Sequence, residues 1–148
     1  MKKLFLALLV VMMMGVSAMA SAAPSNSSLL NEEEKITAKV FDAFAGKADY
    51  ETAIKPYLTK GLAKNFSHAQ FTKAKSESDK NFGKFVNPKL FTLQKFDKAD
   101  RLFYIAGSSK APAVEVGFVF DTTGAKVLLD GINMRPVEVK QAPAAAKK

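Results

Sequence analysis

Few side chains in this sequence have the chemistry of a catalytic base. His68 is the only histidine, and Asp130 is a carboxylate that interrupts an apolar run near the end of the chain. An imidazole or a carboxylate can move a proton when its surroundings tune its pKa, so these two are the candidate catalytic residues. Because His68 falls at a predicted helix start and Asp130 beside Gly131, we expect both to face solvent, with Asp130 at a bulge or an outward position.

Other common reaction centres are not predicted. The chain has no cysteine and a single histidine, so a transition-metal site is not expected. The sequence also contains no Ser-His-Asp order typical of hydrolases and no glycine-rich phosphate loop. We therefore predict neither a metal nor a cofactor.

Aromatic residues are the main candidates for a ligand pocket. The chain holds twelve phenylalanines and three tyrosines, which could fill a core or line an apolar cavity. The sequence alone leaves both alternatives open. The candidates for lining a pocket are Phe41, Phe44, Tyr57, Phe82, Tyr104, Val116 and Phe118.

Three helices are predicted before any strand. Asn31 and Glu34 have the spacing of a capping box after a short polar linker at 23–30, and the acidic run 32–34 suits the positive end of the helix dipole. Gly46 is a natural stop for this helix. Its expected inward stripe is Ile36, Val40, Phe41 and Phe44.

The second helix is short and the third has clear boundaries. Asp49 is a candidate cap for the second helix, which Pro56 must end or bend, and residues 61–65 are predicted to form a loop. In the third helix, Ser67 is the predicted cap and Gly83 the predicted end. Phe66 can pack on Phe71 as a hydrophobic staple, and Gln70 completes a capping box.

Four strands follow, at 90–96, 101–106, 113–120 and 125–132. Asp121 and Gly124 flank the predicted tight reversal between the last two strands, where Gly124 can supply a positive φ. Gly117 is expected to mark a bend or bulge that curls the sheet. One face of the third strand carries the volume to meet the helices: Val114, Val116, Phe118 and Phe120.

The predicted fold is therefore α+β, with three N-terminal helices packed on a curved four-stranded antiparallel sheet across residues 31–137. In this order of elements the chain resembles small secreted domains of the nuclear-transport-factor-2-like (NTF2-like, cystatin-like) superfamily. This resemblance implies a cone-shaped fold, and it decides nothing about activity. It rests on Phe41, Phe44, Asp49-Tyr50, Phe82-Gly83, Arg101-Leu102-Phe103-Tyr104, Phe118-Val119-Phe120-Asp121 running into Gly124, and Pro136.

The first residues have the layout of a secretory signal peptide. Lys2 and Lys3 precede an apolar run from Leu4 to Met14, and small residues then offer cleavage after Ala22. That run is too short to span a membrane, so no stable anchor is expected after cleavage. We predict a bacterial exported protein, periplasmic or secreted, with a disordered Ala/Pro/Lys tail at 138–148.

The number and distribution of charged side chains indicate which kinds of partner to expect. The chain carries 22 basic and 14 acidic side chains, and the lysines are spread rather than clustered with arginines and aromatics. Nucleic-acid binding is therefore not expected. The sequence favours a non-catalytic binding module for a small apolar ligand or an envelope protein partner, with a homodimer through the sheet as a further candidate. Two alternatives stay open: a small isomerase- or lyase-like enzyme using a cavity carboxylate, and an accessory or inhibitor domain for a secreted or envelope protein.

Overall fold

The computed structural model describes residues 26–138. The predicted signal peptide at 1–22 and the tail from residue 139 lie outside this part of the chain. The chain divides into two compact units between Glu32 and Glu33, and the account below concerns the second unit, apart from the first turns of one helix. The elements are α2 (Asn26–Phe44), α3 (Tyr50–Ala53), the 3-10 helix η1 (Lys55–Tyr57), α4 (Lys60–Asn65), α5 (His68–Asn81), β1 (Phe85–Lys95), β2 (Ala99–Ser108), β3 (Val114–Asp121) and β4 (Leu128–Pro136).

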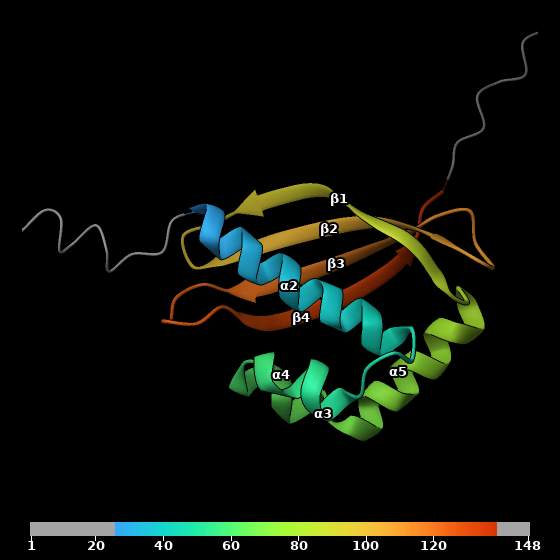
Figure 1. Cartoon of the computed structure of the whole chain (residues 1–148), viewed down its shortest axis with the longest axis horizontal. Helices are drawn as coiled ribbons and strands as arrows, with labels where there is room; N and C mark the ends of the chain where they lie inside the picture. The colour runs from blue at the N-terminus through green and yellow to red at the C-terminus, as the bar shows by residue number, and fades with distance from the viewer. Residues whose placement is uncertain (1–25, 139–148) are drawn as a thin grey trace, which may run out of the picture. The chain divides into compact units, whose positions relative to one another are not determined.

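The α+β class is confirmed. The four strands pair antiparallel in the order β1-β2-β3-β4, and the helices come before them in the chain (Figure 1). Within the described residues there are four α-helices rather than the predicted three, because α4 occupies part of the predicted loop. Thr59 makes this possible: its side chain accepts a hydrogen bond from the Leu62 backbone N–H at 3.1 Å and so caps α4.

The start of the first helix differs from the prediction. α2 begins at Asn26, so Asn31 lies inside the helix and the capping box with Glu34 is wrong. Leu29 and Leu30 favour helix, which extends the element over residues 26–30 of the predicted linker, while residues 23–25 lie outside the described residues. The buried stripe of α2 also includes polar side chains beside the expected apolar ones: Glu33, Ile36, Thr37, Val40, Ala43 and Phe44.

The other predicted helix boundaries are confirmed. Asp49 accepts from the Thr52 backbone N–H at 3.0 Å, and Ser67 accepts from Gln70 N–H at 3.4 Å. Gly46 and Gly83 have φ angles of 74° and 73°, which is the left-handed conformation that ends a helix.

The core lies between α2 and the inner face of the central strands. Val116, Phe118 and Phe120 of β3 are at most 1% exposed, as predicted for that face. Phe41 of α2 places its ring 5.5 Å from the rings of both Tyr104 and Phe118, edge to face. Because such rings bury large apolar areas, this contact fixes α2 on β2 and β3.

Gly117 does not mark a bulge, since the register of β3 with both neighbours is continuous through it. A Cβ there would lie 2.4 Å from Asn133 Oδ1 and 3.2 Å from a Phe103 ring carbon, so the glycine permits a close approach. The irregularities lie elsewhere. β1 has two register shifts, and β4 carries Asp130 as an extra residue opposite the Val119/Phe120 step, the bulge that the sequence predicts.

The β3–β4 connection is longer than predicted. β3 ends at Asp121 and β4 begins at Leu128, so residues 122–127 form the loop and the tight reversal is wrong. Gly124 does not adopt a positive φ. Instead the Asp121 side chain accepts hydrogen bonds from both the backbone N–H and the hydroxyl of Thr123, at 2.9 and 2.6 Å, which turns the chain.

Gly83 provides a test of this architecture. In the variant Gly83→Ala, a side chain would occupy a left-handed backbone position and its Cβ would fall 2.0 Å from Ser109 Oγ. We expect the free energy of unfolding to fall by about 1–2 kcal/mol, measured by urea denaturation. The matched control is Gly61→Ala in α4, where the nearest atom is 3.9 Å from the added Cβ. That variant should be neutral or slightly stabilising, and equal losses in the two variants would contradict the assignment.

Candidate functional site

The two candidate catalytic residues lie apart on the surface. His68 is exposed in the first turn of α5, and its Nδ1 is 3.7 Å from Glu51 Oε1. Asp130 is exposed at the β4 bulge and accepts a hydrogen bond from the Thr59 hydroxyl at 2.6 Å. The structure does not bring His68 and Asp130 together, and neither lines the pocket between α5 and β4 described below.

Most of the candidate pocket residues are core. Tyr104, Val116 and Phe118 are buried, and Phe41 packs on Tyr104 and Phe118, so these side chains fill space rather than enclose it. Tyr57 is half-buried, and its hydroxyl accepts a hydrogen bond from Lys39 Nζ, which also lies 4.5 Å from the ring centroid. The remaining two, Phe44 and Phe82, do line a pocket.

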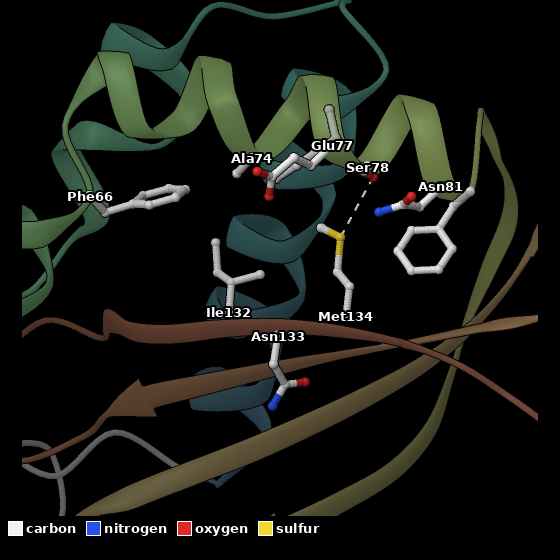
Figure 2. Close-up of a pocket in the computed structure, with 10 residues that line it drawn as sticks. Phe66, Ala74, Glu77, Ser78, Asn81, Ile132, Asn133 and Met134 are labelled. Atoms are coloured by element: carbon white, nitrogen blue, oxygen red, sulfur yellow. Dashed lines mark hydrogen bonds between the residues drawn. The ribbon is translucent and has the colours of Figure 1, made fainter.

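That pocket lies between α5 and β4 and encloses about 300 Å³ (Figure 2). We call it the α5–β4 pocket. Its walls combine phenylalanine rings from the end of α2, the α4–α5 junction and the end of α5 with the inner face of β4. The lining residues are Phe44, Phe66, Ala74, Glu77, Ser78, Asn81, Phe82, Ile132, Asn133 and Met134.

Residue size and spacing explain why space is left here. Positions 74, 77, 78 and 81 fall on one face of α5, and this face turns toward β4. Two of these positions, Ala74 and Ser78, carry small side chains, which leaves space between the helix and Ile132 and Met134 (Figure 2). Ser78 Oγ lies 3.7 Å from Met134 Sδ, so helix and strand are in contact at this point.

Sequence reasoning missed the β4 side of the pocket and the polar residues of α5. The alternation along β4 carried the signal: Ile132 and Met134 pair with the buried Phe118 and Val116 and must share their face. Asn133 points to the other face of the sheet (Figure 2), where it meets Gly117. A strand prediction that ended at residue 132 could not use this alternation.

A cluster of buried polar side chains lies under α2, away from the α5–β4 pocket. Glu33 is fully buried and Asp100 of β2 is 3% exposed. Neither carboxyl oxygen of Glu33 has a hydrogen-bond partner among residues 26–138, and the neighbouring carboxyl group that raises its pKa is that of Asp100. Two neighbouring buried carboxyl groups repel each other when both are charged, which favours the protonated form of one of them. We call these two residues the acid pair, with Glu33 as the protonated member.

Burial is the main reason for this protonation. It raises the pKa of Glu33 from 4.5 to about 8, and the neighbouring Asp100 carboxyl acts in the same direction. Lys95 opposes them: its Nζ lies 2.6 Å from Asp100 Oδ2, and its positive charge lowers the pKa of Glu33. Lys95 and Asp100 face each other in the β1–β2 register, so the hairpin itself positions this ion pair.

A tyrosine and a threonine complete the surroundings of the acid pair. Thr37 Oγ1 and the Tyr104 hydroxyl lie 2.9 Å apart, and burial raises the pKa of the Tyr104 phenol. The sequence carried a signal for this cluster: Glu33 precedes Thr37 by one turn on the buried stripe of α2. Likewise Asp100 alternates with the buried Leu102 and Tyr104 along β2. The interpretation of residues 32–34 as capping acids therefore missed the buried position of Glu33.

The acid pair can hold a proton, but it does not border the α5–β4 pocket. Phe44 lines the pocket and Glu33 sits about 16 Å from it along the axis of α2. Within residues 26–138 no group of three or more His, Cys, Asp or Glu side chains could hold a metal ion. The same residues include no helix long and apolar enough to cross a membrane. Comparison with known proteins found no matching family model, curated protein or solved structure.

The acid pair predicts an unusual dependence of stability on pH. A carboxyl group whose pKa is raised in the folded state stabilises the fold fully below its unfolded pKa, here 4.5, and the stabilisation is lost as the pH rises through about 8. We expect the free energy of unfolding to fall by roughly 2–4 kcal/mol between about pH 5 and pH 9, since each unit of pKa difference is worth about 1.4 kcal/mol. Urea denaturation across this range measures it.

Two variants isolate the source of this dependence. Glu33→Gln keeps the size of the side chain and removes the titration, so its profile should be much flatter than that of the wild type. Asp42→Asn is the matched control, because Asp42 is an exposed carboxylate on the same helix whose charge does not act on Glu33, so the slope should be unchanged. A flat wild-type profile, or a slope that persists in Glu33→Gln, would show that Glu33 does not titrate in this way.

Proposed function

We propose that this chain is an exported, non-catalytic binding module that accepts a small apolar ligand in the α5–β4 pocket. The observation that carries the proposal is the pocket itself: about 300 Å³ of space, with phenylalanine, isoleucine and methionine walls and a few polar groups at one side. This combination is typical of small-molecule sites, whose volumes start at about 300 Å³. The size favours a single-ring or short-chain ligand.

We also propose that the domain is an NTF2-like cone. The support is the order of elements, with helices first and then four meandering antiparallel strands, together with helix α2 packed on the inner face of the sheet. The bulges in β1 and β4 supply local curvature that a cone needs. The export proposal rests on Lys2, Lys3, the apolar run and the small residues around Ala22.

One observation favours the alternative of a small isomerase- or lyase-like enzyme: Glu33 has a strongly perturbed pKa, which is common at catalytic sites. However, Glu33 is fully buried and does not line the α5–β4 pocket, so a ligand held there does not reach it. A non-catalytic role is consistent both with the raised pKa of the buried Glu33 and with its separation from the pocket. The homodimer through the sheet stays a prediction, for which the 72% exposure of Phe91 in β1 is the supporting feature.

The pocket can be closed by one substitution. In Ala74→Leu the larger side chain enters the gap between α5 and β4, so the affinity for a ligand in the pocket should fall by about tenfold or more. The ligands to use are 4-phenylbutan-1-ol and octan-1-ol, with binding to the full chain measured by ligand-observed NMR and isothermal titration. The unfolding midpoint of the variant should not fall, because leucine fills existing space and favours helix.

The control is Ala69→Leu, an exposed position two residues after the Ser67 cap on the same helix. It adds the same side chain away from the pocket and should leave the affinity unchanged. Binding that resists Ala74→Leu would place the ligand elsewhere. No binding of either alcohol by the wild type would remove the small-ligand proposal and leave the alternative of an envelope protein partner, which a pull-down from envelope extract addresses.

A further inference from the structure

The charge of the α5–β4 pocket differs from that of the chain as a whole. Basic side chains outnumber acidic ones 22 to 14, yet Glu77 is the only charged residue in the lining and it is acidic. Its carboxylate turns toward Ala74, over the space between α5 and Ile132 (Figure 2). A pocket of this basic protein therefore carries a negative charge at its polar side.

Glu77 is not neutralised by the protein. Lys73 and Lys80 lie within one turn of it on α5, but no ion pair among residues 26–138 includes Glu77, whereas the neighbouring Asp79 pairs with Lys75 at 2.6 Å. Glu77 is also exposed, so water and ligands can reach its carboxylate. A cation entering the pocket meets a carboxylate that is available for pairing.

The rest of the lining also suits a cation attached to an apolar body. Phe66 and Phe82 are half-buried and present ring surface to the pocket, and aromatic faces attract ammonium groups. Asn81, one turn after Glu77, offers an amide oxygen that can accept a hydrogen bond from an ammonium group. No lysine or arginine is part of the lining, so no positive charge there can pair with an anionic head group.

We infer that the ligand class of the α5–β4 pocket is a small organic amine, with its ammonium group at Glu77 and Asn81 and its apolar body against Phe82, Ile132 and Met134. This inference rests on the proposed binding function and narrows it from an apolar ligand to a cationic amphiphile. Fatty acids, which carry the opposite charge, are then poor ligands. The volume of about 300 Å³ limits the body to one ring or a short chain.

Three ligands with one apolar body and different head groups test this. Isothermal titration of the full chain with 4-phenylbutylamine, 4-phenylbutan-1-ol and 4-phenylbutanoate should rank them in that order. Because the ion pair is partly hydrated, we expect the amine to bind about three- to tenfold more tightly than the alcohol. In Glu77→Gln the amine should lose this advantage while the affinity for the alcohol stays unchanged. Added salt should weaken the amine alone.

Asp97→Asn is the matched control, since it removes the same charge from an exposed position in the β1–β2 loop. It should leave the preference for the amine intact, and thermal unfolding should show that both variants fold like the wild type. If the alcohol binds as tightly as the amine, or the preference survives Glu77→Gln, the inference is overturned and the proposed function stands. If none of the three ligands binds, both are overturned.

Discussion

The structure depends on the packing of α2 against the inner face of β2 and β3. Phe41 sits edge to face on both Tyr104 and Phe118, and the β3 side chains beneath it are almost completely buried. Burying a phenylalanine of this kind contributes about 1.5–3 kcal/mol, so a few such residues decide where the helix lies. Once α2 is fixed, its last residue, Phe44, reaches the α5–β4 pocket and its Glu33 is held against Asp100.

The acid pair and the α5–β4 pocket differ in their access to water. At the acid pair, the surrounding protein excludes water and the pKa of Glu33 is raised, so the site is closed and bears on stability. At the α5–β4 pocket, small side chains on α5 leave a gap beside β4, and Glu77 stays in contact with solvent. A perturbed pKa alone would direct attention to Glu33, whereas accessible space and an unpaired charge together favour Glu77 as the residue that meets a ligand.

Local rules predicted much of this fold. The caps at Asp49 and Ser67, the helix ends at Gly46 and Gly83 and the buried face of β3 follow from neighbouring residues, and all are confirmed. The sequence could not reveal features that join distant segments. Glu33 and Asp100 meet only because α2 crosses β2, and the α5–β4 pocket exists only because Ala74 and Ser78 face a strand more than fifty positions later. The loop at 122–127 was not predicted, because the chain turns through hydrogen bonds to the Asp121 side chain and not through a glycine with a positive φ.

The most direct test of the central claim is an NMR measurement of where an amine sits in the full chain. Intermolecular contacts from the ring of 4-phenylbutylamine should reach the Met134 and Ile132 methyl groups, with backbone shifts concentrated along the 74–82 segment of α5. This result would place the ligand in the α5–β4 pocket. Contacts confined to the opposite face of the sheet, around Phe91 and Phe103, would contradict the account.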